Sequence, residues 1–319
     1  MGENGLSVLD VLTRDPGTAQ DKTLEGVWQS YQRERGSGAS PFAAAVLVAS
    51  QVDRLGFAFA VGYPAALEEL VEGVRLPVAL CVTEAKGNGP RAIETALESD
   101  GDGYRLTGTK TFVTFGRYAE TLIVVAKAGD KPDGRPNLVV VQIPSNRAGV
   151  ELQELPKAPF VPEIPHTSMI LEQVEVLRSE RLAGDGYLEY VKPFRTIEDI
   201  HVVGATLGYV LGLVRRTDAS PTLIGEMTAG LMALDGLRRS PPLAPAVHVA
   251  LQGVYERVTA LMRSDAFARL LDAVAADERE RWERDKALLQ VASKAREARF
   301  ERAVRAIYSA ASAPSRTVA

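Results

Sequence analysis

The sequence predicts an α+β protein in which a compact β domain stands between two helical regions. Apolar residues recur with the period of a helix in residues 1–78 and again after about residue 180. Between them, several short strand-like runs are separated by turns rich in Gly, Pro and Asp, which favours an antiparallel barrel or sandwich. We therefore expect an N-terminal helical domain (1–78), a middle β domain (79–178) and a C-terminal helical bundle (179–319).

The N-terminal region has clear helix boundaries. Gly36-Ser37-Gly38 marks a flexible break, and Ser40-Pro41 supplies an N-cap and a first helical residue for the segment that follows. The pairs Tyr63-Pro64 and Leu76-Pro77 are expected to end further short segments. The apolar stretch Phe42–Val52 is too short to cross a bilayer, so we expect it to be a buried helix.

The middle region carries the strand signals. Asp100-Gly101-Asp102-Gly103 lies between two alternating segments and is a strong hairpin signal. The expected strands are Val78–Val82, Ala92–Glu98, Tyr104–Thr114, Thr121–Ala126, Asn137–Ile143, Val150–Leu155 and Thr167–Leu171. No helical pattern stands between these strands, as expected for an antiparallel barrel or sandwich.

The C-terminal region is expected to be helical over Ile197–Val214, Leu223–Leu237, Ala246–Met262 and a long segment from Ser264 to Ala311. Its first apolar stretch, Ile200–Val214, is too short for a membrane span and is expected to be a buried helix. The charged run Asp277–Lys286 is typical of a solvated helix face. The tail, Ala313–Ala319, is expected to fray. Glycines at four-residue intervals indicate close helix packing: Gly204, Gly208 and Gly212.

Composition argues against several classes of function. The 319 residues are 46% hydrophobic and 24% charged, which is ordinary for a globular protein with two or three cores. The net charge of −4 argues against a nucleic-acid binder, which needs a basic face. With Cys81 as the single cysteine and three scattered histidines, neither a disulfide framework nor a zinc site is expected. The first residues have no signal-peptide pattern, so we expect a cytoplasmic protein without a membrane span.

Three ordered motifs stand in the middle region at consistent spacing. Cys81-Val82-Thr83-Glu84-Ala85, followed by a glycine loop, resembles the pattern C-x-T-E-P-x-x-G-S. Gly101–Lys110 resembles G-D-G-Y-x-L-x-G-x-K, and Thr111–Gly116 resembles x-W-I-T-N-G. These are motifs of the acyl-CoA dehydrogenase family, and the resemblance is dense over residues 75–212. It implies N-terminal helices, a middle β-barrel or sandwich and a C-terminal bundle.

The resemblance also implies a chemistry. Members of this family are FAD-dependent oxidoreductases of lipid metabolism, which remove an α-proton and a β-hydride from an acyl thioester. The hydride passes to flavin N5. The implied partners are an acyl-CoA or acyl-carrier thioester, an electron-transfer flavoprotein as electron acceptor, and further subunits of a homo- or hetero-oligomer.

A flavin ring needs hydrogen-bond donors along its polar edge and a flat apolar wall. Thr83 and Thr114 offer hydroxyl groups at neighbouring strand ends, and Phe112 offers an aromatic face where the family usually has Trp. Glycine-loop amides can turn toward a pyrophosphate. The residues expected to bind the cofactor are Cys81, Thr83, Gly87, Asn88, Gly89, Phe112 and Thr114. Taken singly, each of them is equally an ordinary strand or hairpin residue, and Cys81 a small apolar one.

The catalytic base is expected to be Glu198. Most members place this glutamate after a Q-x-x-G-G motif, and no such motif follows Ala287–Tyr308, which resembles the helix before it. A minority carry the base ten residues before the glycine of an L-G pair, and counting back from Gly208 gives Glu198. The alternative is an acid that complements the helix dipole, as Asp199 would. His201 shares the face of Glu198 and could assist, but a lone His on an apolar helix is usually a core residue.

Other positions depart from the family pattern. Gly89-Pro90 stands where Ser-Asp is expected, and Thr222–Gly225 lacks the Arg that in many members reaches the flavin of a neighbouring subunit. Three hypotheses follow for the function. The chain is an active dehydrogenase of shortened design, a flavin-poor or inactive partner subunit of a heteromeric acyl-CoA dehydrogenase, or a binding protein that kept the fold alone.

Overall fold

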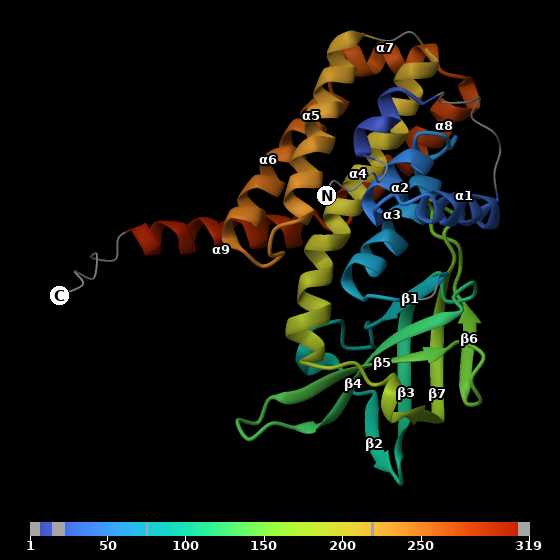
Figure 1. Ribbon diagram of the computed structural model, residues 1–319, viewed down its shortest axis with the longest axis vertical. Helices are drawn as coiled ribbons and strands as arrows, with labels where there is room; N and C mark the ends of the chain where they lie inside the picture. Colours follow the sequence, from blue (N-terminus) through green and yellow to red (C-terminus); the bar gives the residue numbers. More distant parts are fainter. Residues whose placement is uncertain (1–6, 15–22, 75, 218–219, 312–319) are drawn as a thin grey trace. The chain divides into compact units, whose positions relative to one another are not determined.

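The computed structural model describes residues 7–14, 23–74, 76–217 and 220–311 (Figure 1). Its contacts divide the chain into two compact units: a helical unit, Met1–Gly62 with Asp199–Ala319, and a β unit, Tyr63–Glu198. The order of N-terminal helices, a β half-barrel and C-terminal helices confirms the predicted α+β fold class. The expected domain borders at residues 78 and 178 stay a prediction, and the expected fraying of the tail falls outside the described residues.

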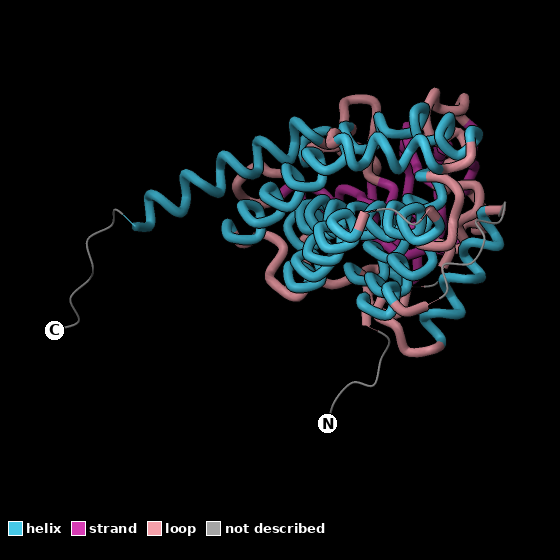
Figure 2. The backbone as a smooth tube through the Cα atoms, turned by 90° about the horizontal axis from the view of Figure 1, so that it is seen from above, coloured by secondary structure: helices cyan, strands magenta, loops and turns pink. Residues whose placement is uncertain are grey.

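The helical unit combines elements from both ends of the chain, and Figure 2 shows the helices as cyan tubes. Its elements are η1 (Val8–Leu12), α1 (Leu24–Gly36), α2 (Pro41–Ala49), the start of α3 (Leu55–Leu70), most of α4 (Lys192–Arg216), α5 (Pro221–Arg238), α6 (Pro245–Met262), α7 (Asp265–Ala273), α8 (Ala276–Asp285), η5 (Lys286–Gln290) and α9 (Ser293–Ala311). Helix α9 packs against α6 and then extends past the other helices (Figures 1 and 2). The long helix expected after Ser264 is divided into pieces, because Val274 at the end of α7 is extended.

Helices α2 and α3 show how local sequence sets their boundaries. The Ser40 hydroxyl accepts a hydrogen bond from the Ala43 amide at 3.2 Å, and a proline follows at the first helical position, as predicted. Pro64, in contrast, lies inside α3, so the prediction that it ends a segment is wrong. A proline cannot donate to the carbonyl four residues earlier, here Ala60. The indole N–H of Trp28 donates to that carbonyl instead, at 2.8 Å.

The glycines of α4 allow its backbone to touch α2. A Cβ atom added at Gly208 would lie 2.5 Å from the carbonyl oxygen of Val46, and one added at Gly212 would lie 2.0 Å from that of Ser50. Because backbone atoms cannot move aside as a flexible side chain can, the predicted role of these glycines in helix packing is confirmed.

Replacing Gly212 with alanine is therefore expected to lower the free energy of unfolding by about 1–3 kcal/mol. Gly253 on α6 is the matched control, because a Cβ atom there would meet open space. Gly253→Ala should be neutral or slightly stabilising, since alanine is the better helix former. Urea unfolding of both variants measures the difference, and equal stabilities would contradict the packing argument.

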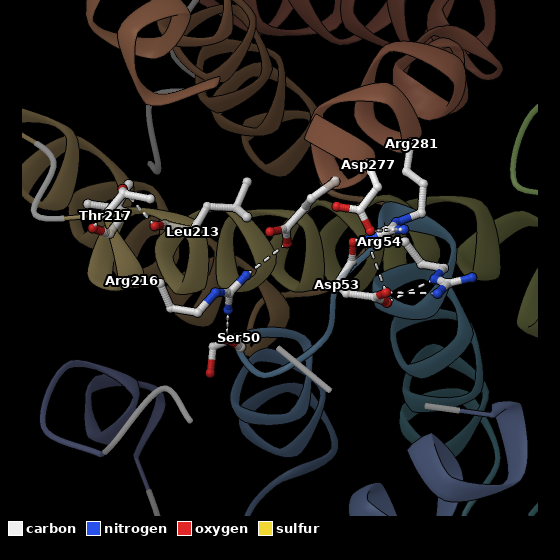
Figure 3. A network of polar contacts seen from close by, with 10 residues as sticks. Ser50, Asp53, Arg54, Leu213, Arg216, Thr217, Asp277 and Arg281 are labelled. Carbon is white, nitrogen blue, oxygen red and sulfur yellow. Dashed lines mark hydrogen bonds and ion pairs between the residues drawn. The ribbon is translucent and has the colours of Figure 1, made fainter. Parts of the chain in front are cut away.

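Charged side chains form a network within the helical unit (Figure 3). Arg216 of α4 donates to the Ser50 carbonyl at 3.3 Å and pairs with Glu278 of α8 at 2.9 Å. Asp53, after α2, pairs with Arg281 of α8 at 3.2 Å.

The charged run of α8 was predicted to be a solvated face, and most of its charged side chains are exposed, but two are buried. Glu278 is 7% exposed and Asp285 is fully buried. Glu278 pairs with Arg216 of α4 and Asp285 with the neighbouring Arg284, and a run of charges cannot reveal a partner such as Arg216 that lies far away in sequence.

One continuous helical stretch, Gly186–Arg216, is long and apolar enough to cross a membrane. Within its most apolar window, 83% of the residues are buried inside the protein. Residues Phe42–Ala49 of α2 are likewise all buried. Both apolar segments are therefore buried core helices, as predicted.

The β unit is built on one sheet of seven strands (Figure 1). The strands are β1 (Val78–Cys81), β2 (Ala96–Asp100), β3 (Gly103–Thr114), β4 (Thr121–Asp130), β5 (Pro136–Pro144), β6 (Val150–Glu154) and β7 (His166–Leu177), and the short helices are η2 (Pro90–Ala92), η3 (Arg178–Glu180) and η4 (Gly186–Val191). The strand order is β1-β4-β2-β3-β7-β6, and β5 pairs with β4. Most pairs are antiparallel as predicted, but β1 and β2 pair with β4 in parallel.

The predicted hairpin joins β2 and β3. Asp100 pairs with Gly103, and Gly101 has a φ of 55°, which a glycine adopts without strain. The sheet places its apolar side chains on a common core, which includes Cys81, Leu106, Val113, Leu122, Val124, Val139, Val141, Met169, Leu171 and Val174, none of them more than 1% exposed. The opposite side of β3 is therefore available for other contacts.

Candidate functional site

Four side chains from three segments project from the same face of the sheet. Thr83 lies opposite Phe112 in an antiparallel bridge, and Thr114 of β3 lies opposite His166 of β7. Residues opposite each other in a sheet point to the same side. The Phe112 and His166 rings stack with their centroids 4.2 Å apart and 26° between their planes, which joins the two pairs into one surface. We call Thr83, Phe112, Thr114 and His166 the outer patch.

An irregularity in β3 turns these residues outward. The pairing of β3 with β7 shifts between Lys110 and Val113, whose side chains are both fully buried. In a regular strand two residues three apart face opposite sides, so one residue of the segment is extra. Phe112, next to the shift, is consequently 46% exposed despite its size.

The polar groups of the outer patch have unused hydrogen-bonding capacity. Among the described residues, the hydroxyls of Thr83 and Thr114 have no hydrogen-bond partner. The buried Nδ1 of His166 also has none, and burial lowers the pKa of this imidazole. The stack therefore presents a neutral ring at neutral pH. His166 does not stand out in the sequence, because its neighbour Phe112 is 54 residues away in the chain and no motif contains it.

A buried ion pair anchors the strand end that carries Thr83. Lys110 Nζ donates to Glu84 Oε1 at 2.6 Å and to the Val125 carbonyl at 2.6 Å. Glu84 also accepts from the Thr95 hydroxyl at 2.7 Å and from the Glu94 amide at 2.7 Å. Burial alone would raise the pKa of Glu84, but Lys110 and these hydrogen bonds hold it below its ordinary value.

This pair was not singled out from the sequence, although both residues stand in the quoted motifs. A lysine at a position that the strand pattern makes buried is the signal that could have found it. The pair fixes the position of the glycine loop. Glu84, before the loop, accepts hydrogen bonds from Thr95, after the loop, and from Lys110 of β3.

The glycine loop offers fewer donors than predicted. Gly87 has a φ of 111°, and its amide donates to the Glu84 carbonyl at 2.8 Å, which closes a tight turn. This N–H is therefore not available for a ligand, whereas the amides of Asn88 and Gly89 have no partner among the described residues. The Cys81 side chain is fully buried, and burial raises the pKa of its thiol to about 12, so its contact with any ligand would be through the backbone.

Glu198 lies beside a cluster of aromatic rings. The centroid of the Tyr63 ring lies 5.8 Å from that of Phe115, which follows Thr114, and 5.7 Å from that of Phe194 of α4. The Tyr63 hydroxyl accepts a hydrogen bond from the Leu80 amide of β1 at 3.2 Å. Burial raises the pKa of Tyr63, and the negative charge of Glu198 raises it further. The Tyr63 ring thus connects the helix that carries Glu198 with the ends of β1 and β3.

Glu198 and the adjacent Asp199 have different surroundings in the structure. Helix α4 begins at Lys192, so Glu198 and Asp199 lie beyond its first turn and the dipole alternative is wrong for both. Asp199 is 7% exposed and forms ion pairs with Arg296, at 3.2 Å, and Arg299 of α9. It is a structural acid of the helical unit.

His201 packs in the helical unit. Its ring is fully buried and contacts the edge of Phe42 with centroids 5.5 Å apart. The predicted core role is thus the one that the structure favours. In the described part of the chain, no group of three or more His, Cys, Asp or Glu side chains is placed to hold a metal ion.

The outer patch has the chemistry that a flat heteroaromatic ring requires. An exposed phenyl ring stands between two hydroxyls, and two loop amides follow Thr83 in the chain; none of these four groups has a partner among the residues that the structure describes. Most of the predicted cofactor residues are thus together on one face of the sheet or in the loop beside it. A bound ring could be stacked, and its polar edge could be hydrogen-bonded.

Comparison with known proteins agrees with this picture. The family description "Acyl-CoA dehydrogenase, middle domain" matches residues 79–174, which contain the sheet and the loop. Among curated proteins, a "3-(aryl)acrylate reductase" of Clostridium sporogenes (strain ATCC 15579) is 28% identical over 145 residues. This match covers 44% of the present chain and 38% of the length of that relative.

Solved structures share the fold over most of the chain. The prolyl acyl carrier protein oxidase AnaB is 17% identical, with a TM-score of 0.64 over 88% of this chain and 89% of that one. Butyryl-CoA dehydrogenase from Megasphaera elsdenii is 15% identical, with a TM-score of 0.60 over 93% of both chains. FMN-bound TdsC from Paenibacillus sp. A11-2 is 17% identical, with a TM-score of 0.57 over 82% of this chain and 83% of that one. At these identities the likeness shows the fold alone.

Proposed function

Because the chain belongs to the acyl-CoA dehydrogenase family, we propose that it is a flavin-dependent oxidoreductase that forms a double bond between the α and β carbons of an acyl thioester. The observation that supports this function best is the outer patch, where the exposed Phe112 ring stands between hydroxyls that have no partner in the described part of the chain. The cofactor is FAD, as in most of the family, or FMN, the group named for the TdsC structure.

The proposed roles follow from the chemistry of each residue. The flavin, when bound, accepts a hydride from the β carbon of the thioester. Thr83 and Thr114 hydrogen-bond the polar edge of the ring, and Phe112 covers one of its faces. Glu198 removes the α-proton as general base.

The surroundings of Glu198 suit this role. A base for a weakly acidic C–H group works best where water is largely excluded, so that proton transfer is matched to working pH. Glu198 is partly buried on α4, and its charge acts on the buried Tyr63. The proposed setting is the cytoplasm, with an electron-transfer flavoprotein as electron acceptor.

The direct test is the absorption spectrum of the purified chain. We expect a flavin band, and the released cofactor should be identified as FAD or FMN by chromatography. Phe112→Ala is expected to weaken flavin binding about 10-fold, because it removes the stacking face. Leu177→Ala is the control, since Leu177 is also exposed, at 49%, but stands at the far end of β7. Equal flavin affinities of the two variants would contradict the site.

One observation favours a second candidate, the partner subunit of a heteromeric enzyme. Helix α9 leaves Ile307 and Tyr308 exposed, at 43% and 72%, which is the kind of surface that a further subunit covers. A chain that is colourless alone and takes up flavin only when produced with a second subunit would support this candidate. Mass measurement in solution separates the homo-oligomer from the hetero-oligomer.

A further inference from the structure

Arg195 of α4 reaches the glycine loop of the β unit. Its Nη2 donates to the carbonyl oxygen of Asn88 at 3.3 Å and to the side-chain Oδ1 of the same residue at 3.2 Å. Its Nε and Nη1 have no hydrogen bond to any described residue. The guanidinium is thus held at the loop while most of its donors remain unused.

Two further cations lie near Arg195 or near the loop that it contacts: Lys192 along α4, and Arg91 along the chain from Asn88. Lys192 lies three residues before Arg195 on α4, so the two side chains are neighbours on one helix face. Arg91 of η2 follows Asn88 by three residues, which keeps their Cα atoms within about 11 Å. We call Arg91, Lys192 and Arg195 the basic cluster.

The basic cluster is not neutralised by the protein. Among the described residues, no carboxylate lies within ion-pair distance of its three members. The neighbouring Lys86, in contrast, pairs with Glu94. Unpaired like charges repel one another, so their concentration at one loop favours an anion.

The loop backbone complements these charges. The amides of Asn88 and Gly89 have no partner in the described chain, whereas that of Gly87 closes the turn. Backbone N–H groups together with a guanidinium fork are the donors that proteins use for phosphate. Carboxylate ligands would need fewer donors and fewer charges.

We propose that the basic cluster and the two loop amides bind the phosphate groups of a ligand of the proposed reaction. This inference rests on the proposed function, which supplies two ligands with that chemistry. One is the diphosphate of a flavin dinucleotide, and the other is the phosphate of a pantetheine arm that carries the acyl group. Arg195 is the central residue, because its Nη2 contacts the loop while its Nε and Nη1 have no partner among the described residues.

Calorimetric titration of the full chain with inorganic pyrophosphate tests the site without requiring turnover. Arg195→Met is expected to weaken pyrophosphate binding about 10- to 100-fold, since it removes charge-assisted hydrogen bonds. Arg269→Met is the matched control, because Arg269 of α7 is an exposed arginine without a partner among the described residues. Arg195→Lys should lie between the two, because it keeps the charge and loses the fork.

The affinities of the variant for FAD, FMN, CoA and pantetheine distinguish the two sources of the phosphate. If the flavin supplies it, Arg195→Met weakens FAD more than FMN and leaves CoA unchanged. If the acyl carrier supplies it, the variant weakens CoA more than pantetheine and leaves FAD unchanged. Binding of pyrophosphate, FAD and CoA by Arg195→Met as tight as by Arg269→Met would overturn the inference.

Failure of the inference about the basic cluster can be distinguished from failure of the proposed function. A chain that binds flavin and is reduced by a thioester, but binds phosphates independently of Arg195, keeps the function and loses the basic cluster. A chain that binds pyrophosphate through Arg195, but never binds flavin, keeps the anion site and loses the function. Unfolding midpoints of all variants establish that the fold is intact.

Discussion

Replacing Lys110 with methionine is expected to lower the free energy of unfolding by about 3–5 kcal/mol, because it leaves Glu84 buried without its counter-charge. Methionine has nearly the volume of lysine, so the change tests charge rather than packing. Lys127→Met is the control: its pair with Asp130 is 34% and 55% exposed, and such exposed pairs contribute about 0–1 kcal/mol. Urea unfolding at neutral pH measures both.

The loss of stability in Lys110→Met is expected to depend on pH in one direction. The pKa of Glu84 is lowered in the folded protein, so the stabilisation it provides is present above its unfolded pKa and is lost as pH falls through the folded value. Without Lys110 the same carboxyl is expected to have a raised pKa and to gain from protonation. The difference in stability between wild type and Lys110→Met should therefore shrink from pH 7 toward pH 4. A constant difference would exclude the buried charge as its cause.

A double variant separates the pair from its surroundings. Glu84→Gln with Lys110→Met removes both charges and is expected to recover part of the lost stability, because no uncompensated charge stays buried. A loss in the double variant equal to the sum of the losses in Glu84→Gln and Lys110→Met would show that the two residues act independently.

Replacing Glu198 with glutamine is expected to lower the rate of thioester oxidation by about 10²- to 10⁴-fold, the usual contribution of a general base. The amide keeps the size and the hydrogen bonds of the side chain but cannot accept the α-proton. In a flavin-loaded chain, the absorption band should stay and its bleaching by saturated acyl-CoAs, tested without oxygen, should be lost.

The control for this experiment is Glu72→Gln, an exposed carboxylate of the β unit without a partner among the described residues. It should bleach as the wild type does. Retention of bleaching in Glu198→Gln would exclude Glu198 as the base while leaving flavin binding untouched. Loss of the flavin itself would assign Glu198 a structural role instead.

Local signals predicted much of the fold. Ser40-Pro41 caps and starts a helix through contacts within four residues, and Asp100–Gly103 forms its hairpin through the conformation of one glycine. The outer patch was predicted in part, because motif spacing brought together Thr83, Phe112 and Thr114.

The remaining features depend on partners that are distant in the sequence. Pro64 continues a helix because Trp28 satisfies the carbonyl that the proline abandons, and no window around Pro64 contains that tryptophan. Asp199 looks like a helix-start acid until Arg296 is placed beside it. The parallel pairing of β1 with β4 likewise joins segments about 40 residues apart.

The extra residue of β3 between Lys110 and Val113 has a consequence for how such a chain can change over time. It lets one strand send a lysine inward and, two positions later, a phenyl ring outward. Deleting Phe112 would restore strict alternation and leave Thr111 in the outward position, with the ladder to β7 still formed. A relative could thus lose the aromatic face of its ligand surface in one genetic step and remain folded.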